Sequence, residues 1–466
     1  MEPELTTNAQ KQPWKNVNKR DIFDSSELVF LRNLNSELKT LHSELNKMDI
    51  LRIATAGSVD DGKSTLIGRL LYETNSITQD KIEALESASK RKGLDFLDLS
   101  LLTDGLIAER EQGITIDVAH IYFSTPHRKY IIADTPGHFE YTRNMVTGAS
   151  NTSVSIILID ARNGVVEQTK RHFYISSMLR IKNIIVAVNK MDLVAYSQEK
   201  FEAIKAELLG IAEQVSFKGQ TLQFIPISSL YGENLVRKSE ETPWYDGATL
   251  LDSLEKFSTQ NSELSTIQAR FPVQHVVRPK TEEYHDYRGY AGKIASGTFL
   301  VGDLVEALPS GQISKIKTIE KFGTQLESGN AKESVVITLE DNIDVSRGNM
   351  LVKVGEQPES RKELSAKICW LDSQMLTVGK TYLLQHGINR VKAKITNISS
   401  VIDIKNMSLS NEAPVDGGLK LNEIGWISLK TASPVFADKY EENPANGSFI
   451  LIDESSNGTV GVGFVE

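Results

Sequence analysis

Length, composition and charge exclude several classes of protein before any motif is considered. The chain has 466 residues, of which 40% are hydrophobic, and its formal net charge is −9. This length is too great for one hydrophobic core and predicts about three domains. No apolar run approaches the roughly 18 residues of a transmembrane helix. The acidic balance gives no general attraction to nucleic acid or to an anionic membrane.

The cysteine content points to a reducing compartment. Cys369 is the single cysteine, so no disulfide can form within the chain. Because no apolar signal segment follows Met1, we expect a cytoplasmic protein. Cys369 lies in the apolar run from Ile368 to Leu371, which indicates a core residue rather than a nucleophile.

Residues 1–48 form an N-terminal extension in our interpretation. The first 24 or so are polar and show no periodicity. Apolar residues then recur at alternating spacings of three and four, which predicts an amphipathic helix. This helix would pack either on the nucleotide domain of the same chain or on a partner subunit. The apolar positions are Leu31, Leu34, Leu38, Leu41, Leu45 and Met48.

An α/β domain is predicted over residues 49–258. Continuous apolar runs alternate there with helical patterns, as in a parallel sheet covered by helices on both faces. Ligands of such sheets bind at the carboxyl ends of the strands. The apolar runs are Leu51 to Ala56, Tyr130 to Ala133, Ser155 to Ile159, Asn183 to Val188 and Gln223 to Ile227.

Beyond residue 260 the pattern changes to short strands divided by glycine turns, with no long amphipathic helix. We therefore expect two β-barrels, over 268–355 and 362–466, separated by the polar segment Gly355 to Ser360. Neither barrel sequence shows a grouping of metal ligands or of a nucleophile with its base.

A phosphate-binding loop follows the first apolar run. The pattern G-x-x-x-x-G-K-[ST] turns the backbone so that successive N–H groups and a helix N-terminus face a polyphosphate. Lys63 would reach the β and γ phosphates, and the Ser64 hydroxyl would bind Mg²⁺. The loop therefore predicts a nucleoside triphosphate site. Its residues are Gly57, Ser58, Val59, Asp60, Asp61, Gly62, Lys63, Ser64 and Thr65.

Two further segments carry groups for Mg²⁺ and for hydrolysis. Thr115, in the charged segment Glu109 to Asp117, would supply a second hydroxyl to Mg²⁺ when a γ phosphate is present. Asp134 would act in the magnesium shell through a water molecule, and the Gly137 N–H would contact the γ phosphate. His138 is our candidate for positioning the attacking water. The second segment consists of Asp134, Thr135, Pro136, Gly137 and His138.

The residues that follow two later strands predict which nucleobase the site binds. The Asp192 carboxylate can accept hydrogen bonds from guanine N1–H and from its exocyclic amine, and adenine offers neither donor in that arrangement. We therefore expect GTP rather than ATP. Asn189 would fix the loop, and the Lys190 stem would cover the base. The residues are Asn189, Lys190, Met191 and Asp192, followed later by Ser228, Ser229 and Leu230.

Together these motifs resemble the translational GTPase superfamily, and within it the elongation-factor group that delivers aminoacyl-tRNA. That group also has a nucleotide domain followed by two barrels. Ser229 departs from its usual Ser-Ala-Leu triplet, with little consequence if the contact comes from the main chain. Val59 and Ile114 fall where the group has an apolar gate beside the histidine.

Other stretches resemble a narrower family, the GTPase subunit of the two-subunit sulfate adenylyltransferase of bacterial sulfate assimilation. The likeness runs from about residue 49 to the C-terminus. It is carried by Asp104 to Glu111, Tyr141 to Ser150, Ile159 to Arg162, Asn189 to Val194, Arg288 to Gly292, Leu308 to Gly311, Asp344 to Gly348, Asn443 to Gly447 and Val460 to Gly463.

This resemblance implies a subunit that hydrolyses GTP with Mg²⁺. A small catalytic partner subunit would make adenylyl sulfate and pyrophosphate from ATP and sulfate, in a heterodimer or a higher assembly. Some members carry an adenylyl sulfate kinase, which needs a second phosphate loop. No such loop follows residue 65, so kinase activity is not expected.

Two rival functions remain at this point. One is delivery of aminoacyl-tRNA, for which a local basic patch would suffice. The other is a GTP-gated interaction protein without coupled chemistry.

Two local features also stay open. Residues 284–288 are either a partner-binding loop or a barrel turn, and Arg110 is either an arginine finger or a solvated residue of its segment.

Overall fold

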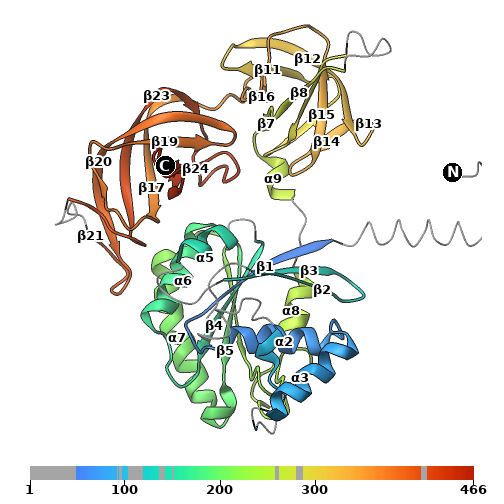
Figure 1. The fold of residues 1–466 in the computed structure, drawn as a ribbon, viewed down its shortest axis with the longest axis vertical. Coiled ribbons are helices and arrows are strands. Elements are labelled where there is room, and N and C mark those ends of the chain that lie inside the picture. Colours follow the sequence, from blue (N-terminus) through green and yellow to red (C-terminus); the bar gives the residue numbers. More distant parts are fainter. Residues whose placement is uncertain are drawn as a thin grey trace, which may run out of the picture. The chain divides into compact units, whose positions relative to one another are not determined.

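The fold begins with a sheet covered by helices on both faces and continues with two β-barrels (Figure 1). The computed structural model describes residues 49–91, 93, 97–102, 119–135, 142–149, 152–257, 262–279, 287–410 and 417–466. The predicted fold class, an α/β P-loop GTPase domain followed by two all-β barrels, is confirmed. The helix expected within residues 1–48 lies outside the described residues.

The first sheet has the strand order β2-β3-β1-β4-β5-β6. Strands β3, β1, β4, β5 and β6 run parallel, so their carboxyl ends meet at one edge. The strands are β1 (Ile50–Ala56), β2 (Ala119–Ser124), β3 (Lys129–Asp134), β4 (Val154–Asp160), β5 (Asn183–Asn189) and β6 (Thr221–Pro226).

One strand departs from the expected parallel sheet. Strand β2 pairs antiparallel with β3, to which a turn over 125–128 connects it. It is the edge strand, in which three of the six residues are exposed and only Phe123 is buried. An edge strand needs no long apolar run, and the three apolar residues from Ile121 to Phe123 are fewer than those of the predicted central strands.

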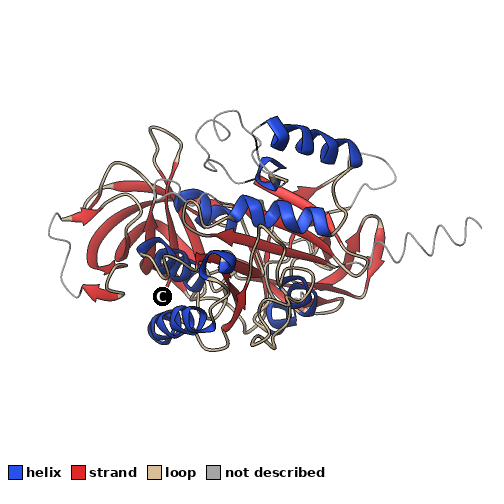
Figure 2. Ribbon diagram, turned by 90° about the horizontal axis from the view of Figure 1, so that it is seen from below, coloured by secondary structure: helices blue, strands red, loops and turns tan. Residues whose placement is uncertain are grey.

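Helices cover both faces of this sheet, as Figures 1 and 2 show. Alternate residues of a strand pack on opposite faces. Ile157 and Ile159 join the core beneath α6 and α7, whereas Ile156 and Leu158 join the core beneath α2 and α8. The helices are α2 (Lys63–Glu73), α3 (Gln79–Arg91), α5 (Thr142–Ala149), α6 (Glu167–Met178), α7 (Gln198–Val215), α8 (Leu250–Lys256) and α9 (Ser262–Thr266), with the 3-10 helices η1 (Leu99–Leu102) and η3 (Met191–Val194).

The first barrel sheet has the order β7-β16-β11-β12-β15-β9-β8, with β13 paired to β12, and a small sheet pairs β10 with β14. Its interior holds large buried side chains such as Phe271, Tyr290 and Phe299. The strands are β7 (Arg270–Pro272), β8 (His275–Val277), β9 (Gly289–Lys293), β10 (Thr298–Leu300), β11 (Leu304–Leu308), β12 (Gln312–Lys321), β13 (Thr324–Leu326), β14 (Ser328–Asn330), β15 (Ser334–Leu339) and β16 (Met350–Lys353).

The second barrel is closed by strand pairing. Its sheet runs β19-β24-β25-β17-β23-β20-β21, and an additional β19–β20 pairing joins the two sides, which removes the exposed edges there. The strands are β17 (Ser360–Trp370), β18 (Leu376–Thr377), β19 (Thr381–His386), β20 (Asn389–Asp403), β21 (Ser408–Ser410), β22 (Gly418–Leu419), β23 (Ile424–Phe436), β24 (Ser448–Ile452) and β25 (Thr459–Val465). The exact domain boundaries, 49–258, 268–355 and 362–466, remain our proposal.

Cys369 is a core residue, as its apolar neighbours predict. It is fully buried in the cluster that also contains Phe173 of α6 and Ile424 of β23. Burial raises the pKa of the thiol to about 12, so the reactive thiolate is scarce at neutral pH.

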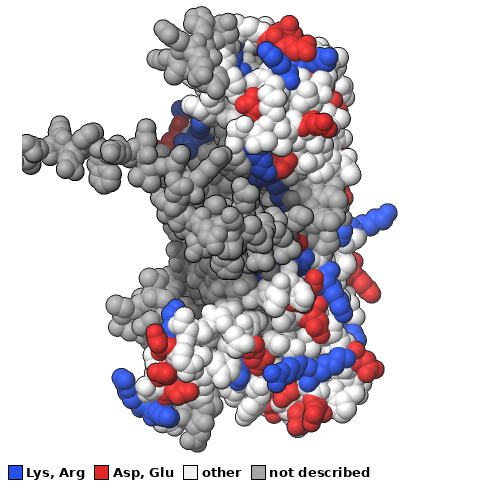
Figure 3. Space-filling view, turned by 90° about the vertical axis from the view of Figure 1, so that its right-hand side faces the viewer, with Lys and Arg blue, Asp and Glu red and all other residues white. Residues whose placement is uncertain are grey.

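The described surface carries charges of both signs. On the face in Figure 3, Lys and Arg side chains alternate with Asp and Glu side chains. None of the described helices is both long and apolar enough to cross a membrane.

Candidate nucleotide-binding site

The phosphate loop connects β1 to α2. Gly62 caps the N-terminus of α2 with a φ of 94°, a left-handed conformation that favours glycine. Ser64 and Thr65 are half-buried in the first turn of α2, and Val59 and Asp60 are exposed. The first turn of this helix therefore presents unpaired backbone N–H groups where a phosphate would bind.

Two neighbouring segments leave little room for a side chain on the glycines of this loop. A Cβ on Gly62 would lie 2.5 Å from Asn189 Nδ2. A Cβ on Gly57 would lie 3.1 Å from the Cβ of Leu158, at the end of β4. Both glycines thus allow the close approach of strands β4 and β5 to the loop.

Gly62→Ala is expected to weaken GTP binding at least about tenfold, since a positive φ costs roughly 1 kcal/mol or more and the clash adds to it. Equilibrium titration with a fluorescent GTP analogue measures the change. Gly210→Ala is the control, because Gly210 lies in α7 with nothing within 4 Å of the added Cβ. Equal affinity of the Gly62 and Gly210 variants would contradict this account.

Lys63 is buried at the centre of the loop. Its Nζ donates hydrogen bonds to the carbonyl oxygens of Gly57, at 2.8 Å, and of Ser58, at 3.1 Å. Burial lowers the pKa of the Lys63 amine, and the negative charges of Asp134 and Asp61 oppose this effect. The ammonium group is therefore held by the loop and surrounded by carboxylates.

Asp61 stabilises the same loop through a hydrogen bond within it. Its carboxylate accepts a hydrogen bond from the Ser58 N–H, and burial raises its pKa. The Oγ atoms of Ser58 and Ser229 are buried and have no hydrogen-bond partner among the described residues. Such hydroxyls are free to contact a bound polar ligand.

Asp134 lies at the carboxyl end of β3, directly beside β1. Thr55 Oγ1 donates to Asp134 Oδ1 at 3.0 Å, and Thr135 Oγ1 donates to the carbonyl of Thr55. Both Asp134 and Thr135 are buried. Four of the predicted residues, Thr115, Pro136, Gly137 and His138, lie outside the described part of the chain, so their roles stay predictions.

The two predicted base-binding segments meet at Asn189, the last residue of β5. Asn189 Nδ2 donates to the carbonyl of Asp61 at 2.7 Å, and its Oδ1 accepts from the N–H of Ser229 at 2.9 Å. Asp192 Oδ1 accepts from Ser228 Oγ at 2.6 Å. Met191 is fully buried and Leu230 is half-buried. Asn189 thus fastens the phosphate loop to the segment 228–230.

The comparisons with known proteins place this site in a family. The Elongation factor Tu GTP binding domain matches residues 48–267, and the GTP-eEF1A C-terminal domain-like family matches residues 363–466. Sulfate adenylyltransferase subunit 1 of Colwellia psychrerythraea is 48% identical over 420 residues, which cover 90% of this chain and 88% of that protein. The chain belongs to the sulfate adenylyltransferase subunit 1 family.

Further relatives agree with this assignment. Sulfate adenylyltransferase subunit 1 of Bacteroides fragilis is 46% identical over 92% of this chain and 88% of that protein. The protein named Bifunctional enzyme CysN/CysC of Mycobacterium tuberculosis is 47% identical over 89% of this chain and 67% of that protein. The resemblance to translational GTPases and to the sulfate adenylyltransferase GTPase subunit is confirmed.

Sequence reasoning assigned no role to three residues that contact the site of this family member. Asp160 ends β4 and pairs with Lys190, and Arg162, two residues further on, contacts Asp160. Arg69 of α2 donates hydrogen bonds to the carbonyls of Ser229, at 3.4 Å, and of Leu230. Asp160 could have been recognised from the sequence, because its carboxylate ends a buried strand at the ligand-binding edge of the sheet. Nothing in the sequence pointed to Arg69.

The site combines the groups that a nucleoside triphosphate requires. Lys63 and the first turn of α2 offer positive charge and N–H donors for the phosphates. Asp192 offers a carboxylate for the base at the other end of the site. No three His, Cys, Asp or Glu side chains gather into a metal site within the described residues. A hydroxyl at Ser64 and a buried carboxylate at Asp134 nevertheless fit Mg²⁺, which commonly takes its remaining ligands from phosphate and water.

Proposed function

We propose that this chain is the GTP-hydrolysing subunit of a sulfate adenylyltransferase. In that role GTP hydrolysis drives a small catalytic partner subunit, which makes adenylyl sulfate and pyrophosphate from ATP and sulfate in the cytoplasm. The observation that carries the proposal is the identity of 46–48% to proteins named sulfate adenylyltransferase subunit 1, over 90–92% of the chain. The nucleotide site described above supplies the matching chemistry.

The residues of the site would have separate roles in binding and hydrolysing GTP. Lys63 and the loop N–H groups would bind the β and γ phosphates, and Asp192 would accept hydrogen bonds from guanine. Ser64, Thr115 and, through water, Asp134 would hold Mg²⁺, which would neutralise phosphate charge. His138 would orient the attacking water.

Coupling of GTP to a second reaction needs two states of the complex that GTP and its products favour differently. The phosphate–sulfate anhydride is unfavourable to form, so free energy must come from another reaction. In our proposal the segments Glu109 to Asp117 and Asp134 to His138 respond to the γ phosphate and alter the docked partner. Asp134 connects the second segment to β1 through Thr55.

The test uses this chain co-expressed with a candidate small subunit. Adenylyl sulfate is measured with ATP, sulfate and Mg²⁺ in the presence of GTP, GDP or a non-hydrolysable GTP analogue. Of the three guanine nucleotides, we expect only GTP to support net synthesis of adenylyl sulfate. We also expect EDTA to stop GTP hydrolysis. Equal yields with GTP and GDP would overturn the proposed coupling.

A further inference from the structure

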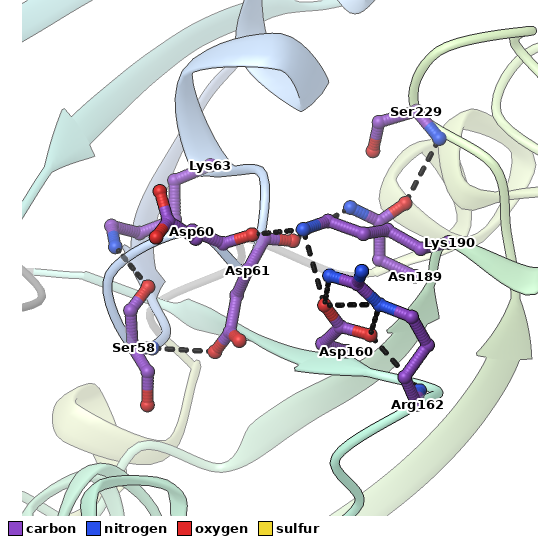
Figure 4. A network of polar contacts seen from close by, with 9 residues as sticks. All are labelled: Ser58, Asp60, Asp61, Lys63, Asp160, Arg162, Asn189, Lys190 and Ser229. Carbon is purple, nitrogen blue, oxygen red and sulfur yellow. Dashed lines mark hydrogen bonds and ion pairs between the residues drawn. The ribbon is translucent and has the colours of Figure 1, made fainter. Parts of the chain in front are cut away.

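Asp160 lies at the end of β4, deep beneath the surface of the nucleotide site. Its side chain is only 1% exposed. It accepts hydrogen bonds from the backbone N–H of Arg162 at 2.9 Å and from the Arg162 guanidinium at 2.6 Å (Figure 4). Burial alone would raise the pKa of Asp160, but hydrogen bonds from Arg162 and Lys190 outweigh it and bring the pKa to about 2. Asp160 is therefore ionised at neutral pH.

Lys190 connects this carboxylate to the phosphate loop. Its Nζ lies 3.1 Å from Asp160 Oδ2 and donates a hydrogen bond to the carbonyl of Asp60. Figure 4 shows the amine reaching between Asp160 and the loop. The Lys190 backbone has a φ of 62°, so the segment turns sharply where its side chain crosses to the loop.

Strand register explains why these groups meet. Asp160 pairs with Asn189 in the parallel alignment of β4 and β5, so Lys190 follows beside Asp160 at the same edge. Asn189 already binds the carbonyl of Asp61. The neighbouring side chains of Asn189 and Lys190 thus bind two successive carbonyls of the phosphate loop. Asp160 pairs with one of these side chains, that of Lys190.

We propose that Asp160 and Arg162 are positioning residues for the nucleotide: Asp160 holds the Lys190 amine on the Asp60 carbonyl and so ties the base-binding segment to the phosphate loop. This inference rests on the proposed GTP site and deepens it. Without Asp160 the Lys190 amine would turn toward water, since its side chain is already 23% exposed. The base-binding segment and the phosphate loop would then no longer be held together at this point.

The test measures dissociation constants of a fluorescent GTP analogue and a fluorescent GDP analogue with the full chain. Asp160→Asn keeps the size of the side chain and removes its charge. We expect affinity for both nucleotides to fall about tenfold, the loss typical of one charge-assisted hydrogen bond. Arg162→Gln should give a smaller loss, about threefold, because it leaves the Asp160–Lys190 pair in place.

Asp303→Asn is the matched control in the first barrel. Asp303 accepts from the backbone N–H of Leu300 at 2.8 Å and pairs with Lys353 Nζ at 2.9 Å, so like Asp160 it combines a backbone hydrogen bond with a lysine ion pair, on a side chain that is 21% exposed. Loss of this ion pair should leave nucleotide affinity unchanged. A tenfold loss in the Asp303 variant as well would overturn the inference, because it would mean that any such change weakens binding.

A double-mutant cycle separates positioning from a general structural role. In a Lys190→Met background, Asp160→Asn should add less than about a twofold loss, because the group through which it acts is gone. The affinity ratio of GTP to ITP should stay the same in Asp160→Asn, since ITP lacks the exocyclic amine assigned to Asp192. Additive losses, or a changed ratio, would contradict positioning through Lys190.

The outcome also distinguishes this inference from the proposed function. If the unsubstituted chain binds GTP but Asp160→Asn and Arg162→Gln bind it equally well, the positioning role is overturned and the GTPase assignment stands. If the unsubstituted chain does not bind GTP, the assignment itself fails.

Discussion

Lys63→Ala is expected to abolish GTP hydrolysis and GTP-driven adenylyl sulfate synthesis. The substitution removes an ammonium group that is buried at the centre of the phosphate loop, where its Nζ lies 2.8 Å from the carbonyl of Gly57. Loss of a cation that stabilises the transferred phosphoryl group commonly costs about 10²–10³ in rate or more. Colorimetric detection of phosphate release, with and without the partner subunit, measures the hydrolysis.

The same variant tests where the adenylyl transfer takes place. The reverse reaction, in which adenylyl sulfate and pyrophosphate give ATP, is downhill and needs no energy from GTP. It should proceed at an unchanged rate in a complex that carries Lys63→Ala, since the partner would hold the ATP site. GTP-dependent synthesis that survives in this complex would show that Lys63 is not part of the coupling.

Lys205→Ala is the control for the lysine change. Lys205 lies on the exposed side of α7 and pairs with Glu202 at 3.1 Å. Exposed pairs of this kind contribute about 0–1 kcal/mol to stability. Hydrolysis and synthesis should therefore match those of the unsubstituted chain, and a thermal melt of both variants checks that each is folded.

The central part of the fold could be predicted because its signals are local. The apolar runs that became β1, β4 and β5 are continuous in the sequence, and each is followed by polar residues of the site. Strand β2 was not predicted, since as an edge strand it has only a short apolar run, Ile121 to Phe123, and its burial largely alternates. The order of strands in the barrels depends on pairing between distant segments, which local patterns do not specify.

The network around Lys190 shows the limit of motif reasoning within the site. The motif Asn189 to Asp192 predicts that these residues face the nucleotide, but the pairing of Lys190 with Asp160 depends on the register of β4 against β5. Arg69 is a similar case. It contacts the carbonyls of Ser229 and Leu230, which lie some 160 residues further along the chain. Such contacts follow from tertiary structure and leave no trace in a single sequence.

Asp192→Asn is expected to reverse the preference for the base. An asparagine in this place keeps one acceptor oxygen and gains an NH₂ group, which would face the exocyclic amine of guanine without forming a hydrogen bond. Affinity for GTP should fall by more than about 10²-fold, because a buried site built for paired hydrogen bonds discriminates strongly against their loss. Xanthosine triphosphate, which carries a carbonyl at that position, should bind the variant better than GTP does.

The position of Asp192 makes this exchange of specificity feasible. Its Oδ1 accepts a hydrogen bond from Ser228 Oγ at 2.6 Å, and an asparagine oxygen can accept the same bond. The side chain would thus stay oriented while its second atom changes from acceptor to donor. Xanthosine triphosphate should then restore hydrolysis and adenylyl sulfate synthesis in the complex, whereas GTP should not. If GTP and xanthosine triphosphate bind the variant equally, Asp192 does not read the base.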